Sequence, residues 1–381
     1  MKMKAAVCRE YKKPLSIEEV ELAPPKEKEV LVKTAYTGFC HSDWSAVAGW
    51  LGFPIPMVLG HEASGVVVDV GPGVTTVKKG DHVVATWMIA CGHCPECTSG
   101  RGYICRTSHG IHTKGGLWDG TSRLTDAKGK RLNHQTFVSG FAEYMVIPEQ
   151  GAIKLPEDFP LDQACFIGCC VPTGYGAVYN VAKVTPGSSV AIWGMGGVGL
   201  NVVRGAKLAG AYPIIGVDLR ESKEDIAREF GITHFVNSSE EDPVQAVQLL
   251  TGGERMEDGT IQGGGANFCF EVIGDPGAIE QAYWALGFGG KLIMVGIPSI
   301  ETRTALPLTL TPPHNRNILG TLYGNVRTHH ELPAIVDQIA RGEYMELSKL
   351  ISKKFKLEEI NDVYDAMTEG RIIGRWVCEW D

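Results

Sequence analysis

Residues 189–218, SVAIWGMGGVGLNVVRGAKLAGAYPIIGVD, hold the pattern that decides the fold. The apolar run Ser189–Trp193 predicts a short buried strand, the spacing in Leu200–Ala209 predicts a helix, and Ile214–Asp218 predicts a second strand. The glycine-rich turn after the first strand gives the backbone the freedom that a tight connection needs. A strand, a turn, a helix and a strand in this order indicate one unit of a doubly wound parallel sheet.

The turn itself indicates dinucleotide binding. Its motif consists of Gly194, Gly196, Gly197, Val198 and Gly199. Backbone amides at the start of a helix attract a pyrophosphate, and glycines let it approach closely, although glycines alone would also fit a plain tight turn. Asp218 stands where an acid binds the adenosine ribose hydroxyls and would repel a 2′-phosphate, which favours NAD over NADP. Lys223 is either a second ribose contact or an ordinary solvated lysine.

The remaining sequence falls into three parts. The first third is rich in short strands and glycine turns, which is typical of β-rich, barrel-like structure; strands are expected at Val30–Ala35, Gly65–Val70 and Asp81–Thr86. The middle part continues the strand–helix alternation, with strands expected at His234–Asn237, Asn267–Ile273 and Lys291–Ile297. The last part predicts helices at Glu331–Arg341 and Leu357–Thr368 and a closing strand at Gly374–Trp380. Residues 106–137 form a polar stretch that we expect to be a long loop, functional or at an interface.

Composition narrows the class of protein. The chain has 381 residues and a formal net charge of -8, which is ordinary for a globular protein of two domains and argues against a nucleic-acid-wrapping surface. No apolar stretch suggests a signal peptide or a membrane helix, so we expect a cytoplasmic protein. The 11 cysteines are then more typical of metal ligands or reduced thiols than of disulfides.

Four of these cysteines form a compact motif. They are spaced as Cys91-x2-Cys94-x2-Cys97-x7-Cys105 among several glycines. Four thiolates on one short loop can complete a tetrahedral shell around zinc and leave no position open for substrate, so the site would be structural. A pair of disulfides and an iron–sulfur cluster are the alternatives, but the usual cluster motif has a shorter last gap followed by Cys-Pro.

A second set of metal-ligand residues is dispersed. Cys40, the pair His61-Glu62 and Cys169 offer two sulfurs and one imidazole, which is a catalytic arrangement when the fourth position stays open. Spacing alone cannot select these residues, because buried cysteines are usually inert and Cys169 has Cys170 beside it.

The motifs together resemble a known family, the zinc-dependent medium-chain alcohol dehydrogenases. Gly60-His61-Glu62-x2-Gly65-x-Val67, the four-cysteine lobe, the segment from Ile167 to Gly176 and the glycine turn occur in the family's order and span nearly the whole chain. The resemblance implies a GroES-like catalytic domain at 1–170 and 323–381, with an inserted NAD-binding Rossmann domain at 171–322. It also implies two zinc ions per chain, one catalytic and one structural.

The resemblance carries roles onto single residues. Cys40, His61 and Cys169 resemble the catalytic zinc ligands, Glu62 the carboxylate close behind the metal, and Asp43 the partner that orients His61. Ser42 resembles the hydroxyl that bonds the substrate oxygen and passes on its proton.

Cofactor contacts are implied in the same way. Thr173 resembles the residue that packs on the nicotinamide, and His41 resembles a contact to the pyrophosphate. Val295 and Ile297 resemble backbone contacts to the carboxamide. Arg375 stands near the place of an arginine that reaches the pyrophosphate in relatives and is a candidate for that role.

Some positions depart from the family pattern. Many relatives have a histidine shortly after the first zinc ligand to relay the proton to solvent; here Trp44, Ser45 and Ala46 occupy that region. The 106–137 segment resembles the longer, dimeric branch that includes the glutathione-dependent formaldehyde dehydrogenases. However, Leu51 and His109 stand where that class has charged residues, so the glutathione adduct is not the predicted substrate.

The prediction is therefore an NAD-dependent zinc alcohol dehydrogenase that interconverts an alcohol and its aldehyde or ketone, as a homodimer. Trp50, Leu51, Trp87 and Met88 are either core residues or the lining of an apolar substrate channel, which would suit a hydrophobic or cyclic alcohol. Two alternatives remain: a nicotinoprotein with permanently bound NAD(H) and an external electron acceptor, or a catalytically silent member of the family.

Overall fold

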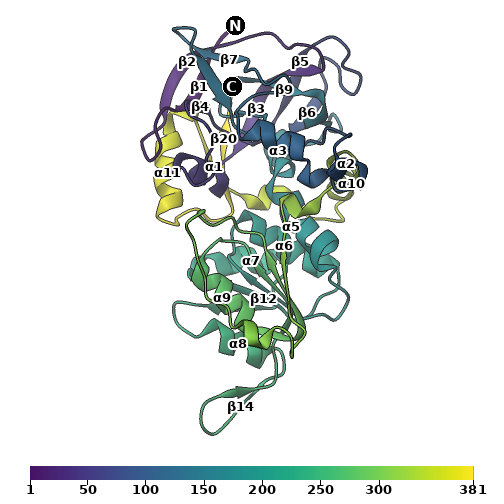
Figure 1. The fold of residues 1–381 in the computed structure, drawn as a ribbon, viewed down its shortest axis with the longest axis vertical. Helices are drawn as coiled ribbons and strands as arrows, with labels where there is room; N and C mark the ends of the chain where they lie inside the picture. Colours follow the sequence, from purple (N-terminus) through teal and green to yellow (C-terminus); the bar gives the residue numbers. More distant parts are fainter. Residues whose placement is uncertain (381) are drawn as a thin grey trace. The chain divides into compact units, whose positions relative to one another are not determined.

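The computed structural model describes residues 1–380, which form two compact units (Figure 1). Unit 1 comprises residues 1–170 and the C-terminal segment from residue 327, and unit 2 comprises residues 171–326. Within residues 1–380, no helix has both the length and the apolar character needed to cross a membrane.

Unit 1 is built on β-structure. One set of strands closes into a barrel in the order β1 (Lys2–Cys8), β2 (Ser16–Leu22), β7 (Leu124–Asp126), β8 (Arg131–His134) and β4 (Met57–Val58). A second sheet has the order β10 (Ala152–Lys154), β6 (His82–Ala85), β5 (Glu62–Val70), β3 (Glu29–Gly38), β20 (Arg375–Glu379) and β19 (Ile351–Phe355), and β9 (Tyr144–Pro148) also pairs with β3. The strands expected in the first third and the closing strand are confirmed.

Short helices connect these strands. The α-helices of unit 1 are α1 (His41–Val47), α2 (Pro95–Thr98), α3 (Arg106–His112), α4 (Leu161–Ala164), α10 (Thr328–Ala340) and α11 (Ile360–Thr368), and the 3₁₀ turns are η1 (Gly102–Ile104), η2 (Glu149–Gly151), η3 (Cys165–Gly168), η8 (Leu347–Leu350) and η9 (Leu357–Glu359). The two helices expected after residue 330 are confirmed as α10 and as η9 with α11. α5 (Cys170–Gly176) follows directly on the end of the first segment.

The expectation of one long loop at 106–137 is wrong. The segment contains α3, β7 and β8, and the last two are strands of the closed barrel. Its apolar residues Leu117, Leu124 and Leu132 are fully buried and belong to one core cluster with residues of β1 and β2. Polar residues surround them in the sequence, so the buried positions do not show up as an apolar run.

Unit 2 is the doubly wound parallel sheet that the glycine motif predicts. Its strand order is β13 (His234–Asn237), β12 (Ile214–Asp218), β11 (Val190–Trp193), β16 (Ala266–Glu271), β17 (Leu286–Met294) and β18 (Asn317–Gly320), and every neighbouring pair is parallel. Successive strands are added on one side of β11 up to β13 and on its other side from β16 onward, so the strand order reverses between β11 and β16. In open sheets of this type, ligands bind at the carboxyl ends of the strands beside that point.

Helices and turns complete unit 2. They are α6 (Gly197–Leu208), α7 (Glu224–Phe230), α8 (Pro243–Leu250), α9 (Pro276–Trp284), η4 (Ala177–Ala182), η5 (Glu221–Lys223), η6 (Leu308–Leu310) and η7 (Tyr323–Asn325). A small hairpin of β14 (Glu254–Arg255) and β15 (Ile261–Gln262) extends away from the sheet (Figure 1). The core lies between the sheet and α8 and α9, and it contains Trp193, Val217, Tyr283 and Leu292.

Candidate active site and metal centres

Unit 1 brings the dispersed metal-ligand residues together. Ligand atoms of Cys40, His61, Glu62 and Cys169 all lie within 4.8 Å of one another, and all four residues are buried. Cys40 immediately precedes α1, His61 and Glu62 stand at the start of β5, and Cys169 lies between η3 and α5. Ligands at about 2.0–2.3 Å from a tetrahedral zinc ion are necessarily this close to one another.

Asp43 fixes the orientation of the imidazole. Its carboxylate is fully buried and accepts a hydrogen bond from His61 Nδ1 at 2.9 Å and another from the Cys40 backbone N–H at 2.9 Å. With its proton on Nδ1, the ring presents a lone pair on Nε2, and this buried nitrogen has no hydrogen-bond partner within residues 1–380. An orphaned acceptor beside two sulfurs fits a metal ion.

Glu62 and Arg375 form a buried ion pair behind these ligands. Arg375 Nε lies 3.4 Å from Glu62 Oε2, and Nη2 lies 3.7 Å from the Cys40 sulfur. Both residues are almost completely buried. The backbone leaves little spare room here, because a Cβ on Gly38 would lie 2.6 Å from Glu62 Oε2. The predicted contact of Arg375 with a pyrophosphate is not visible in these bonds and stays a prediction.

The charges in the cluster favour thiolate chemistry. A hydrogen bond from the Cys169 thiol and the positive charge of Arg375 hold the pKa of Cys40 well below the usual thiol range, although burial opposes this. Burial raises the pKa of Glu62 to about 7, against the opposing effect of Arg375. A sulfur that ionises readily is the form that a divalent metal ion binds.

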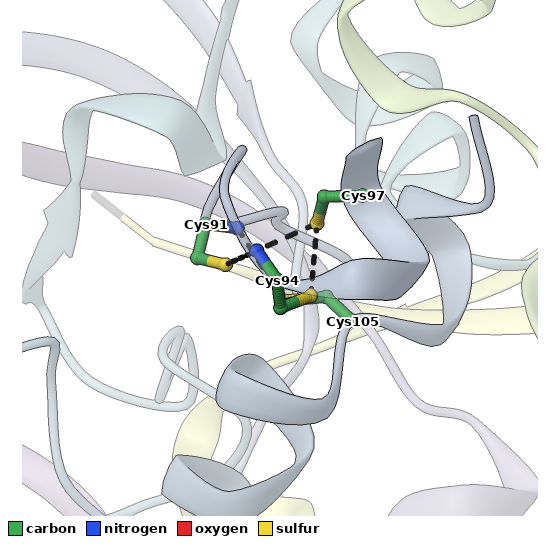
Figure 2. Close-up of side chains that lie close together, drawn as sticks. All are labelled: Cys91, Cys94, Cys97 and Cys105. Atoms are coloured by element: carbon green, nitrogen blue, oxygen red, sulfur yellow. Dashed lines mark hydrogen bonds between the residues drawn. The ribbon is translucent and has the colours of Figure 1, made fainter. Parts of the chain in front are cut away.

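The second centre is the four-cysteine lobe (Figure 2). The Cys91–Cys97, Cys94–Cys97 and Cys94–Cys105 sulfur atoms lie 4.0, 3.4 and 3.8 Å apart. A disulfide needs about 2.05 Å, whereas four sulfurs at about 2.3 Å from one tetrahedral ion lie roughly 3.8 Å from each other. All 11 cysteines of the chain are free thiols in the structure. The lobe therefore fits zinc and not a pair of disulfides.

Backbone amides hold the lobe in shape. The N–H groups of Cys94 and Ser108 lie 3.3 and 3.4 Å from the sulfurs of Cys91 and Cys105. Although burial opposes ionisation, hydrogen bonds from Thr107 and from the His93 and Cys94 amides lower the pKa of Cys91 to about 6. Amide–sulfur bonds of this kind stabilise the negative charge that thiolate ligands carry.

Unit 2 presents the glycine turn between β11 and α6. Gly194 has a φ of +102°, which only glycine adopts easily, and a Cβ on Gly199 would lie 1.8 Å from the Gly194 oxygen. By contrast, a Cβ on Gly196 would meet no atom of the described residues 1–380 within 4 Å. Gly196 directly precedes α6, so this free space lies at the positive end of a helix. The geometry suits a bound pyrophosphate.

Asp218 lies at the end of β12, next to that turn. Its carboxylate accepts hydrogen bonds from the Met195 and Arg220 amides at 2.8 and 3.1 Å. The Lys223 ammonium pairs with the same carboxylate at 2.8 Å. Lys223 is thus not an isolated surface lysine, and both predicted ribose contacts stand together.

The remaining predicted cofactor residues lie in both units. In unit 2, Thr173 lies in α5, whereas Val295 and Ile297 follow the end of β17. The side chain of Val295 is buried and that of Ile297 is 49% exposed. The predicted strand Lys291–Ile297 ends earlier, at Met294, so Val295–Ile297 is a loop. In unit 1, His41 and Ser42 are the first residues of α1, with His41 exposed and Ser42 half-buried.

A row of aromatic rings in unit 1 extends from the buried imidazole of His61. The Trp87 ring stands edge-on to the His61 ring with centroids 6.4 Å apart, and His112 follows at 6.1 Å from Trp87. Phe137 packs on His112 at 4.7 Å. Trp87 could be singled out from the sequence but His112 could not, because a lone histidine in a polar segment gives no signal. Trp44, where relatives have a relay histidine nearby, instead packs on Trp50 and Tyr364.

Comparison with known proteins gives a consistent result. Two family models match, described as "Alcohol dehydrogenase GroES-like domain" over residues 26–157 and "Zinc-binding dehydrogenase" over residues 197–341. The chain is 40% identical to the "Alcohol dehydrogenase class-3" of Cereibacter sphaeroides, covering 98% of both chains. It is 39% identical to the "S-(hydroxymethyl)glutathione dehydrogenase" of Paracoccus denitrificans, again covering 98% of both.

Solved structures agree with this family. The benzyl alcohol dehydrogenase of Acinetobacter calcoaceticus superimposes with a TM-score of 0.90 at 32% identity, covering 100% of both chains. A zinc-binding alcohol dehydrogenase protein from Burkholderia ambifaria gives 0.91 at 35% identity, covering 100% of this chain and 99% of the other. These relatives favour an active zinc-dependent oxidoreductase, and they favour neither a silent protein nor a nicotinoprotein.

Proposed function

The chain belongs to the zinc-dependent alcohol dehydrogenase family and interconverts an alcohol with its aldehyde or ketone, and we propose that NAD(H) carries the hydride. We assign unit 1 as the catalytic domain and unit 2 as the NAD-binding domain. The observation that carries the proposal is the buried cluster of two sulfurs and one imidazole, in which Asp43 bonds His61 Nδ1 and Nε2 has no partner among residues 1–380.

The protein residues have separate roles in this proposal. Cys40, His61 and Cys169 hold the catalytic zinc, Asp43 fixes the imidazole tautomer, and Glu62 lies behind the ligands in its ion pair with Arg375. Zinc in this position supplies Lewis-acid chemistry to an alcohol or carbonyl oxygen. Cys91, Cys94, Cys97 and Cys105 hold a second, structural zinc, because they leave no position for a substrate.

Ser42 would accept the substrate's hydroxyl proton during oxidation and return it during reduction. It lies two residues after Cys40 in the first turn of α1, so the same turn positions a ligand and the proton carrier. Trp44 packs among aromatic rings and its indole donates to Thr368 at 2.7 Å, which leaves no titratable group at that position. A bound cofactor would offer its ribose hydroxyls, together with water, as the onward path for this proton.

The proposed NAD site follows the residues of unit 2. The pyrophosphate binds at the start of α6 over Gly196, and Asp218 with Lys223 receives the adenosine ribose. The carboxylate of Asp218 disfavours the 2′-phosphate of NADP. Thr173 and the backbone of Val295 and Ile297 would hold the nicotinamide end, with His41 reaching the pyrophosphate.

A paired variant tests the catalytic assignment. We expect Cys169→Ser to lose one of two zinc ions per chain and to lower kcat/KM at least about 100-fold, because a ligand is removed. Cys170→Ser is the matched control, since Cys170 is also fully buried and contacts a backbone carbonyl through its sulfur at 3.8 Å. Activity is followed at the nicotinamide absorbance band with NAD⁺ and NADP⁺. Equal zinc and activity in the two variants would reject the assignment.

The substrate we propose is a hydrophobic or cyclic alcohol. The Trp87 ring stands beside the His61 ring, and Leu51 packs on the apolar cluster that includes Phe39 and Val47. Residues at these places offer no positive charge to a carboxylate-bearing substrate. A panel of aliphatic, aromatic and charged alcohols that includes S-(hydroxymethyl)glutathione tests this: a preference for the glutathione adduct would overturn it.

Assembly and location complete the proposal. β18 forms one edge of the parallel sheet and carries Ile318, which is 39% exposed, while Phe288 of the neighbouring β17 is 76% exposed. An edge with exposed apolar residues is open to pairing, and we infer a homodimer formed with a second copy there. Sedimentation of Ile318→Lys against the wild type tests this. The six cysteines of the two metal-type clusters must stay reduced to bind metal, which favours the cytoplasm.

A further inference from the structure

One acid in unit 2 has no role in the function proposed above. Glu271 is the last residue of β16, beside β11 at the point where the order of the sheet reverses. Its side chain is 0% exposed. A fully buried acid at the carboxyl end of a central strand is expensive to keep unless it makes bonds that matter there.

The carboxylate and the backbone of Glu271 tie two loops together. Oε1 accepts hydrogen bonds from the backbone amides of Ile273 and Gly274 at 2.8 and 2.7 Å. The Glu271 backbone oxygen accepts from the amides of Val295 and Gly296 at 2.8 and 3.1 Å. One residue therefore holds both the loop after β16 and the loop after β17.

These two loops touch along their backbones. A Cβ on Gly296 would lie 2.1 Å from the Gly274 nitrogen, and a Cβ on Gly274 would lie 2.8 Å from the Ile297 carbonyl carbon. The pyrophosphate turn meets this loop through side chains and not through its backbone, since a Cβ on Gly194 would lie 2.7 Å from the Ile273 side chain. Movement of the first loop would therefore move Ile297 with it.

The second carboxylate oxygen supports more than a structural cap. Oε2 is buried and has no hydrogen-bond partner within residues 1–380. Burial raises the pKa of Glu271, in opposition to the amides of Gly274 and Ile273. A residue that only capped a turn would not need to bury a second oxygen without a partner, and buried polar groups kept at such a cost gather at functional sites.

We propose that Glu271 is a positioning residue for hydride transfer, which sets the Val295–Ile297 loop in the place where it receives the nicotinamide carboxamide. This inference rests on the NAD(H) function proposed above. The proposal divides the cofactor site into two ends. The turn at Gly196 and the Asp218 carboxylate bind the adenosine diphosphate end, and Glu271 positions only the loop at the nicotinamide end. A role in general folding would not distinguish the two ends.

Two ligands that differ only in the nicotinamide provide the test. Affinities of wild type and Glu271→Ala are measured by calorimetry for NAD⁺ and for ADP-ribose, which lacks the nicotinamide ring. We expect the variant to bind NAD⁺ about tenfold or more weakly, because two loop hydrogen bonds are lost, and to bind ADP-ribose within about threefold of wild type. Retained ADP-ribose binding also shows that unit 2 has folded.

Two further variants sharpen the reading. Glu271→Gln keeps an oxygen for the Ile273 and Gly274 amides, so it should recover most of the NAD⁺ affinity. Glu280→Ala is the matched control: Glu280 Oε1 also accepts a backbone amide, that of Ala305 at 2.9 Å, but in a different loop of unit 2. Its affinities for both ligands should stay at the wild-type values.

The outcomes separate the inference from the function beneath it. Equal weakening of both ligands by Glu271→Ala, or no weakening of either, overturns the positioning role. Failure of the wild-type protein to bind NAD⁺ would instead overturn the proposed cofactor. If Glu271→Ala does not fold, Glu271→Gln decides: a larger loss of affinity for NAD⁺ than for ADP-ribose supports the role, and equal changes in the two affinities refute it.

Discussion

Asp43→Asn isolates the control of the catalytic imidazole. In the wild type, one carboxylate accepts two hydrogen bonds, from His61 Nδ1 and from the Cys40 amide, each at 2.9 Å. Asparagine has nearly the same shape but only one accepting oxygen. If that oxygen serves the Cys40 amide, an NH₂ group faces His61 Nδ1 and favours the proton on Nε2, where it blocks metal binding.

The size of the effect follows from this geometry. Asp43 is 0% exposed, so water cannot replace the lost acceptor. A buried donor left without its partner costs about 1–3 kcal/mol, and loss of a carboxylate behind a metal-bound histidine typically costs about 10–100-fold in affinity or activity. We therefore expect kcat/KM to fall about 10–100-fold and the catalytic zinc to leave at a correspondingly lower chelator concentration.

The second zinc site is an internal reference for this assay. Zinc per chain is measured after dialysis against increasing chelator, in wild type, Asp43→Asn and the control Asp126→Asn. Asp126 is also buried and accepts the Lys128 and Lys130 amides at 3.0 and 2.9 Å, away from the metal cluster. Only Asp43→Asn should lose one zinc early while the four-cysteine zinc remains. Parallel loss of both ions, or unchanged kcat/KM, would refute the reasoning.

Three further predictions follow from other parts of the structure. Cys97→Ser should reduce the zinc content from two ions to one and lower the melting temperature, and a variant that keeps two ions would contradict a four-cysteine site. Gly196→Ala should fold but bind NAD⁺ weakly, which an NAD⁺ titration measures. Gly199→Ala should not yield a folded unit 2, because its Cβ would lie 1.8 Å from the Gly194 oxygen; circular dichroism measures the folding of both variants. Burial, with the charges of Arg123 and Arg131, lowers the pKa of His134 to about 3. In the unfolded chain the His134 imidazole takes up a proton below about pH 6.5, whereas in the folded protein it stays neutral down to about pH 3. The free energy of unfolding at pH 5 is therefore about 2 kcal/mol lower because of His134. Urea unfolding of His134→Gln should show a correspondingly smaller loss between pH 7 and pH 5, and an unchanged loss would argue against a buried neutral imidazole.

Patterns with local causes could be predicted from the sequence. The strand Ile214–Asp218 has the bounds that an apolar run ending in an acid predicts, and the four-cysteine lobe follows from close spacing. The segment 106–137 could not be predicted, because Leu117 and Leu124 are buried by barrel closure with β1 and β2, which no local periodicity records.

The dispersed site marks a second limit of the sequence. Cys40, His61 and Cys169 could be selected only through a resemblance, since their approach depends on β3, β5 and the chain before α5 meeting in three dimensions. Arg375 shows the same limit: its guanidinium lies against Glu62 and Cys40, contacts that the sequence did not indicate, while its pyrophosphate contact stays a prediction. Arginine is almost never buried unless it is paired, so a single arginine in an apolar closing strand indicates an acidic partner buried beside it.

The charges of the catalytic cluster explain why these groups need each other. Two thiolates would balance a divalent ion, and Glu62 with Arg375 forms a pair that adds no net charge, so the buried Asp43 carboxylate behind His61 is the one charge in excess. Removal of Arg375 would leave a buried carboxylate next to two thiolates, and removal of Glu62 would leave a buried guanidinium next to the metal; either change strands an uncompensated charge. The ion pair thus does not need to bind substrate to be indispensable. Because the pair adds no net charge, it would leave the electrostatic potential at the metal to be set by the three ligands and by the Asp43 carboxylate.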